Sequence, residues 1–167
     1  LFPYTTLFRS RKHAKIEPER WYYHCDKLGI IVWQDMVNGG GAYPMWYVTY
    51  LTNALQPLLR YAPDGKLLRG LLGRGSTRSR EEYSRELADT VAALGQHPSI
   101  GCWVPFNEGW GQFDAEKATK ALRVLDPTRL VDEASGWFDR GGGDVHSLHN
   151  YFYPLRIRPK VRTVALS

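Results

Sequence analysis

The sequence has only two cysteines, Cys25 and Cys102, in a chain of 167 residues. They stand far apart and form no C-x-x-C pair, so neither a disulfide framework nor a cysteine zinc site is indicated. We expect both to be buried as small apolar groups. No stretch is long and apolar enough to cross a bilayer, and we therefore expect no membrane partner.

A secretory signal is missing as well, because no charged segment precedes an apolar one at the start of the chain. The chain also lacks an initial Met, so this absence says little about the location of a longer parent protein. Residues 1–10 have no clear hydrophobic period and do not fit the pattern that follows. We interpret residues 1–10 as a non-native or junction segment and residues 11–167 as the domain.

Positive charge is in excess, with a net charge of +5. Much of it falls in one loop-like stretch that contains Arg60, Lys66, Arg69, Arg74, Arg78 and Arg80. A basic patch can bind nucleic acid, but a solvated loop explains this stretch better, and we expect no nucleic-acid partner. Residues 70–77 lack the Gly-Lys-Ser/Thr ending of a phosphate loop. No Gly-x-Gly-x-x-Gly follows an apolar run, so no dinucleotide cofactor is indicated.

What the sequence does contain is a series of short apolar runs that alternate with amphipathic segments. The hydrophobic period predicts helices over residues 18–28, 79–94 and 114–125. The first helix is expected to bury Trp21, Cys25 and Leu28. The second is expected to begin with a capping box at Ser79 and to bury Tyr83, Leu87, Val91 and Leu94. The apolar runs predict strands over residues 10–13, 30–33, 99–106, 130–131, 144–151 and 163–166. This alternation is typical of an α/β fold with parallel strands and right-handed crossovers. Residues 42–78 are the least readable part and predict a functional or disordered loop.

The central apolar run, residues 99–106, stops abruptly at Asn107 and Glu108. In barrels of parallel strands, active sites lie at the carboxyl ends of the strands. Glu108 is therefore a candidate acid or base, with Trp103 and Trp110 beside it as an aromatic floor. A helix N-cap region explains the same residue types equally well.

Further polar residues lie at the end of one predicted strand and within another. Asp35 closes the run at residues 30–33, and its position after a strand favours a functional role over a structural one. His146 and His149 have a spacing that invites a metal site. On a strand, however, residues i and i+3 point to opposite faces, so one metal cannot easily take both and no metal is expected.

Several motifs together resemble the catalytic barrel of glycoside hydrolase family 2. The central ones are His97-Pro98-Ser99-Ile100, the Trp103 strand and Asn107-Glu108 at its end. The supporting ones are Arg11-Lys12-His13, Glu19-Arg20-Trp21-Tyr22, Cys25-Asp26-Lys27-Leu28-Gly29, Val32-Trp33-Gln34-Asp35-Met36, Leu125-Asp126-Pro127-Thr128-Arg129 and His149-Asn150-Tyr151. The resemblance implies a (β/α)₈ TIM barrel, of which approximately strands two to seven are present.

The resemblance also implies roles for individual residues in a retaining exo-β-glycosidase that resembles β-galactosidases and acts on terminal β-linked sugars. Glu108 matches the general acid/base, and no cofactor is implied. The residues expected to contact the sugar are Asn107, His13, Asp35, Tyr151, His149, Trp110 and Trp137.

The chain departs from the family pattern at its ends. The resemblance places the nucleophilic glutamate at the end of strand seven, beyond Ser167, and the preceding β-sandwich domains and remaining barrel strands are also missing. We therefore expect the segment alone to be inactive. Two other hypotheses stay open, a non-catalytic carbohydrate-binding barrel fragment and, less favoured, a nucleic-acid module.

Overall fold

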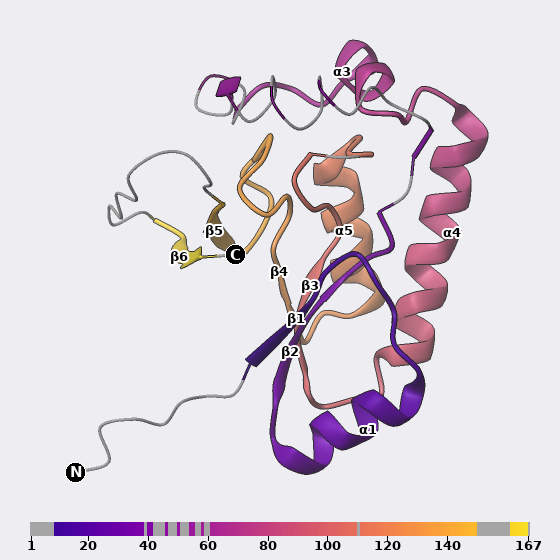
Figure 1. The fold of residues 1–167 in the computed structure, drawn as a ribbon, viewed down its shortest axis with the longest axis vertical. Coiled ribbons are helices and arrows are strands. Elements are labelled where there is room, and N and C mark those ends of the chain that lie inside the picture. The colour runs from indigo at the N-terminus through magenta and orange to yellow at the C-terminus, as the bar shows by residue number, and fades with distance from the viewer. Residues whose placement is uncertain are drawn as a thin grey trace.

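The structure is a computed structural model that describes residues 9–38, 40–41, 46, 50, 54–55, 58, 61–109, 111–149 and 161–166 (Figure 1). Its helices are α1 (Glu19–Leu28), α3 (Lys66–Leu71), α4 (Thr77–Leu94) and α5 (Ala115–Leu125). Its strands are β1 (Arg9–Lys12), β2 (Ile31–Asp35), β3 (Ile100–Val104), β4 (Leu130–Val131), β5 (Val145–Leu148) and β6 (Thr163–Leu166). The predicted α/β alternation is confirmed over these residues.

The first four strands form one parallel sheet in the order β1-β2-β3-β4, and β5 and β6 form a second parallel pair. In the register of the sheet, Lys12 of β1 pairs with Gln34 of β2, and Asp35 of β2 pairs with Val104 of β3. Because all strands run the same way, the segments that follow them meet at one edge of the sheet. Helices α1, α4 and α5 lie on one side of the sheet, and the β5-β6 pair lies on the other (Figure 1).

The sheet begins earlier than the sequence indicated. Strand β1 starts at Arg9, one residue before the predicted strand, and Arg9 and Ser10 pair with Ile31 and Val32 although residues 1–10 were interpreted as a junction segment. Residues 1–8 of that segment lie outside the described residues.

Helix α1 ends as predicted, because Gly29 adopts a left-handed φ of 68° and its N–H caps the last turn. Its buried face differs from the prediction. Tyr22 is fully buried and donates to Gln34 at 2.6 Å, whereas Leu28 is 71% exposed. The hydroxyl of Tyr22 gains a buried acceptor, and this rotates the buried face toward Tyr22 and Cys25.

Helix α4 has the predicted buried face of Tyr83, Leu87, Val91 and Leu94, but its N-cap is Ser76 rather than Ser79. The hydroxyl of Ser79 accepts a hydrogen bond from Arg74 at 2.9 Å instead of capping the helix. Helix α5 begins after Asp114 as predicted. Its first N–H, that of Ala115, is capped by the Asp64 carboxylate at 2.8 Å and not by the Asp114 side chain.

The main core lies between the sheet and helices α1, α4 and α5. Trp103 belongs to this core, with its side chain fully buried and its indole N–H donating to Asp126 at 2.8 Å. This corrects the prediction that Trp103 forms a floor beside Glu108. Cys25 and Cys102 are both free and buried, as expected. Within the described residues, no helix has the length and apolar character that spanning a bilayer requires.

Candidate active site

An ion pair between the partly exposed Arg11 and the buried Asp35 links the ends of the first three strands. The Arg11 guanidinium donates to both carboxylate oxygens of Asp35, at 2.9 and 3.1 Å. It also donates to the amide oxygen of Asn107 at 2.7 Å. Since a guanidinium only donates, the amide oxygen must face Arg11 and the amide nitrogen must face away from it. Arg11 therefore fixes which way the Asn107 side chain points.

Asp35 and His13 differ in their access to solvent. The Asp35 side chain has no exposed surface, and burial raises its pKa, although Arg11 and the Ala14 N–H favour the charged form. The His13 ring is 64% exposed, and its Nδ1 lies 3.9 Å from an Asp35 oxygen. Of these two predicted sugar contacts, His13 is the one that reaches solvent.

Glu108 follows Asn107 in a left-handed backbone conformation, with φ of 52°. Its carboxylate lies 2.9 Å from Nε2 of His149, and both side chains are largely buried. His149 directly follows strand β5, so the contact joins the loop after β3 to the second strand pair. The fold thus brings together two residues that are 41 positions apart and that we singled out separately.

The remaining predicted contacts are placed less directly. Trp110 and Tyr151 lie outside the described residues. Trp137 is 2% exposed and packs against Leu72 and Phe138, so its predicted stacking on a sugar finds no support in the described structure.

Two residues at this edge were not identified as site candidates from the sequence. Arg11 drew attention only as part of a motif, and its role as the cation of the site was missed. Asp132, after β4, is 1% exposed, accepts from Ser147 at 2.5 Å, and has its pKa raised by burial. The sequence did offer a signal for Asp132, because this polar residue directly follows the predicted strand at residues 130–131.

The two histidines of the predicted pair contact different carboxylates. His146 lies 3.2 Å from Asp139, which also accepts from Arg162 at 2.6 Å, whereas His149 contacts Glu108. Among the described residues, no three His, Cys, Asp or Glu side chains gather in a way that holds a metal ion.

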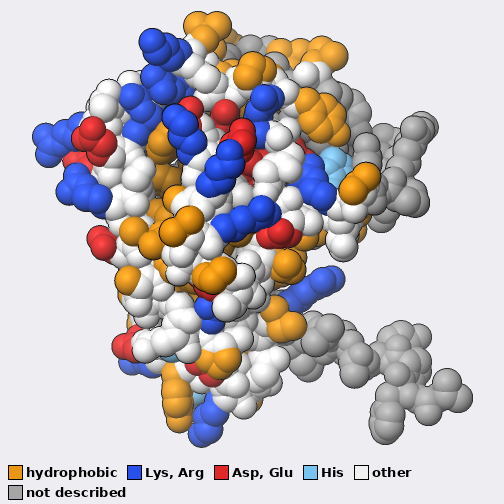
Figure 2. All heavy atoms as spheres, turned by 180° about the vertical axis from the view of Figure 1, so that it is seen from behind, with side chains coloured by type: hydrophobic (Ala, Val, Ile, Leu, Met, Phe, Trp, Pro, Cys, Tyr) orange, Lys and Arg blue, Asp and Glu red, His pale blue; other side chains and the backbone are white. Residues whose placement is uncertain are grey.

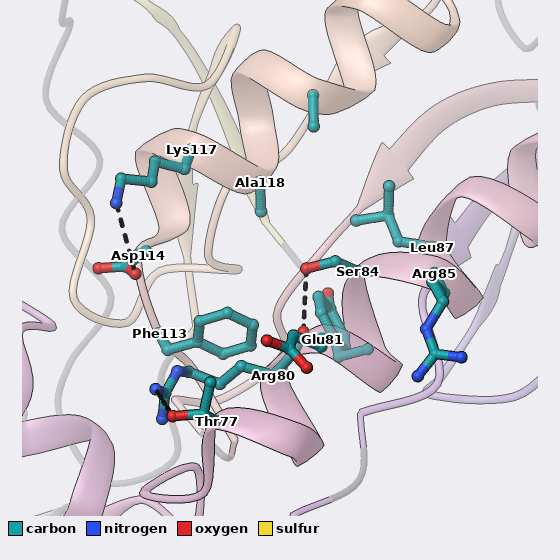
Figure 3. A pocket seen from close by; sticks show the side chains of 12 residues that line it. Thr77, Arg80, Glu81, Ser84, Arg85, Leu87, Phe113, Asp114, Lys117 and Ala118 are labelled. Atoms are coloured by element: carbon teal, nitrogen blue, oxygen red, sulfur yellow. Dashed lines mark hydrogen bonds and ion pairs between the residues drawn. The ribbon is translucent and has the colours of Figure 1, made fainter.

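Two of the hollows that described residues line are considered for a binding role. One, of about 620 Å³, lies between the sheet and β6 and is lined by Arg11, Trp33, Val145 and Val164 among others. The other, of about 760 Å³, is a groove between α4 and α5 on the outer side (Figure 3). Because Arg11 lines the first hollow, that space and not the outer groove is continuous with the ion-pair network. The face shown in Figure 2 intersperses basic and acidic side chains rather than presenting a basic stripe.

Gly109 provides a test of the loop that carries Glu108. Its φ is 75°, and a Cβ there would lie 2.7 Å from the Phe138 ring. We expect Gly109→Ala to destabilise the protein by about 1–2 kcal/mol from backbone conformation alone, with the clash adding to this. Gly141→Ala is the matched control, because Gly141 has a φ of 85° but no atom within 4 Å. Equal losses of thermal stability in the two variants would contradict a role for close packing at Gly109.

No family model matches the chain, but individual proteins do. Beta-mannosidase B of Thermothelomyces thermophilus is 31% identical over 103 residues, which cover 62% of this chain and 8% of the relative. Beta-mannosidase B of Neosartorya fischeri is 32% identical over 111 residues, which cover 66% of this chain and 10% of the relative. These similarities, which extend over about 60% of the chain, support its resemblance to glycoside hydrolase family 2. The chain spans about a tenth or less of the length of these family 2 relatives.

A solved structure supports the same fold. The beta-D-glucuronidase of Dictyoglomus thermophilum aligns with a TM-score of 0.57 and 17% identity, covering 87% of this chain and 24% of that one. At this identity the likeness concerns the fold alone. The parallel strands and intervening helices are compatible with part of a family 2 TIM barrel.

Proposed function

We propose that this segment is part of the catalytic domain of a retaining exo-β-glycosidase, with Glu108 as its general acid/base. The observation that supports this most is the position of Glu108 after β3, next to the oriented Asn107 and in contact with His149. Carboxyl groups in this position of a parallel barrel face the substrate. The segment would contribute approximately strands two to seven of that barrel.

The His149 contact suits a group that alternates between acid and base. When Glu108 is protonated, its O–H can donate to neutral Nε2 of His149. When Glu108 is ionised, the protonated Nε2 can donate to the carboxylate. The 2.9 Å contact is therefore compatible with both states, so neither half of the catalytic cycle leaves the carboxyl without a partner.

The proposed chemistry proceeds in two steps. Glu108 donates its proton to the leaving oxygen while a second carboxylate attacks the anomeric carbon and forms a glycosyl ester. Glu108 then removes a proton from water, which attacks the same carbon and releases the sugar. Retention needs the two carboxyl groups about 5–5.5 Å apart. We propose that the second carboxylate follows Ser167 in the longer protein.

Asn107 supplies orientation in this proposal. Its amide oxygen is engaged by Arg11 at 2.7 Å, which leaves the amide nitrogen facing away from the ion pair. An amide N–H placed next to the acid suits a hydrogen bond to the sugar hydroxyl beside the reacting carbon, which strengthens in the transition state.

A substrate panel tests the function. We expect the full-length protein to hydrolyse an aryl β-mannoside faster than the matching β-glucuronide and β-galactoside, because the relatives with 31–32% identity are named beta-mannosidase B. Release of the aryl group is measured by absorbance. Sugar binding by calorimetry without turnover of any of the three substrates would instead favour a non-catalytic carbohydrate-binding role.

A further inference from the structure

Arg74 is buried, although it belongs to the basic stretch that we interpreted as a solvated loop. It is 5% exposed, and its guanidinium lies 4.9 Å from the ring centre of Tyr83 and 5.9 Å from that of Phe113. Figure 3 shows Phe113 directed toward α4 beside Thr77 and Arg80. Ordering and desolvating a guanidinium is costly unless its N–H groups are satisfied. The acceptors of Arg74 therefore indicate what it holds in place.

The first acceptor of Arg74 lies in the loop that carries Glu108. Arg74 Nε donates to the carbonyl of Gly111 at 3.2 Å. The N–H of the same glycine donates to the carbonyl of Leu72 at 2.9 Å. Gly111 has a left-handed φ of 61° and lies three positions after Glu108. Both of its backbone polar groups are thus held by residues 72–74, which we call the brace.

The other end of the same loop is held by Tyr83, whose ring packs against Arg74. The Tyr83 ring on which the guanidinium stacks donates its hydroxyl to the carbonyl of Pro105, two positions before Asn107. Arg74 Nη1 also donates to the Ser79 carbonyl at 3.1 Å and to its hydroxyl at 2.9 Å, which fixes the guanidinium to α4. Pro105 and Gly111, which lie on either side of Glu108, are therefore held by Tyr83 and by Arg74, and these two side chains stack on each other.

The brace contacts the neighbouring loop as well. The Gly73 carbonyl accepts from the N–H of Gly41 at 2.7 Å, in the segment that follows Asp35 and β2. A Cβ at Gly40 would lie 3.0 Å from that carbonyl, so the two backbones are in close contact. The brace therefore connects the two loops that emerge from β2 and β3 beside the candidate site.

We propose that Arg74 is a positioning residue that sets the placement of the Glu108 carboxyl by holding Gly111 and, through Tyr83, Pro105. The inference rests on the proposed function of Glu108. Misplacement of a reacting group by about 1 Å can lower a rate by about 100-fold. Glu108 itself stands in a left-handed conformation, so its direction depends on how the flanking backbone is held.

The test compares Arg74→Met and Arg74→Lys in the full-length protein, with Arg78→Met as control. Arg78 lies four positions further on, in the first turn of α4, but its side chain is 86% exposed and pairs with Glu82 across one helical turn. Each variant is assayed on aryl β-glycosides with poor and with activated leaving groups. Poor leaving groups need the proton of Glu108, whereas activated ones barely do.

We expect Arg74→Met to lower kcat/KM about tenfold or more on the poor leaving group and less than about threefold on the activated one. Arg74→Lys keeps the charge but not the planar fork that reaches Gly111 and Ser79 together. We therefore expect it to lower the ratio of kcat/KM on the poor leaving group to kcat/KM on the activated one, but by less than Arg74→Met does. Arg78→Met should leave the ratio unchanged. If Arg74→Met does not fold, the ratio measured for Arg74→Lys decides.

Equal losses on both substrates would overturn the inference, because a purely structural role lowers the amount of active protein without changing leaving-group preference. Glu108→Gln in the same assay separates the two levels of the proposal. A leaving-group-dependent loss for Glu108→Gln together with equal losses for the Arg74 variants refutes the positioning role alone. Equal losses for Glu108→Gln refute the acid assignment itself, and the positioning role with it.

Discussion

Glu108→Gln in the full-length protein is expected to lower turnover of substrates with poor leaving groups by about 100- to 10,000-fold. Gln has the shape of the protonated acid but cannot donate a proton of comparable acidity, so the leaving oxygen departs as an alkoxide. Activated aryl leaving groups depart as stable anions and should be affected much less. Steady-state kinetics over a series of aryl glycosides would show this as a steeper dependence on leaving-group pKa.

Glu81→Gln is a suitable control for Glu108→Gln, since Glu81 is an exposed glutamate on α4 away from the strand ends. It should leave kcat and KM unchanged for every substrate of the series. The acid assignment is wrong if Glu108→Gln slows poor and activated substrates to the same extent.

The second large effect is expected from Arg11→Met. Asp35 is fully buried, and Arg11 donates to both of its oxygens, so the substitution leaves a buried carboxylate without its counterion. Breaking a buried pair from one side typically costs about 3–5 kcal/mol. We expect a loss of this size in the free energy of unfolding, measured by chemical denaturation. Activity should also fall, because the Asn107 side chain loses the donor that orients it.

A second substitution in the same background distinguishes charge from packing. Adding Asp35→Asn to Arg11→Met removes the unpaired charge, and we expect it to recover a large part of the lost stability but little activity. Arg9→Met removes an exposed arginine from the same strand and should change stability by less than about 0.5 kcal/mol. A double variant no more stable than Arg11→Met would contradict the ion-pair explanation.

The sequence was most informative where periodicity is strong. The stripe of Tyr83, Leu87, Val91 and Leu94 predicted both the existence and the buried face of α4. The polar residues after the apolar runs predicted which side chains gather at the sheet edge, because parallel strands place their ends together. The proximity of Asp35 and Asn107 follows from that rule once the strand order is known, whereas Arg11, which bridges them from within β1, was missed.

Other features were not readable, for definable reasons. A strand buried on both faces has no polar alternation, so nothing in residues 99–106 showed that Trp103 points into the helix layer and away from Glu108. The brace lies in a stretch without periodicity. Its contact with Gly111 spans 37 positions and is set by tertiary packing, and neither composition nor local spacing encodes it.

The two buried thiols give the protein its own reporters of local opening. Cys25 lies in α1 and Cys102 in β3, and burial raises the pKa of both thiols. Thiol reagents react with the exposed thiolate, so modification of either cysteine requires the surrounding structure to open first. Because α1 covers one end of the core and β3 runs through its centre, their labelling rates would separate fraying at the periphery from opening of the strand that leads to Glu108.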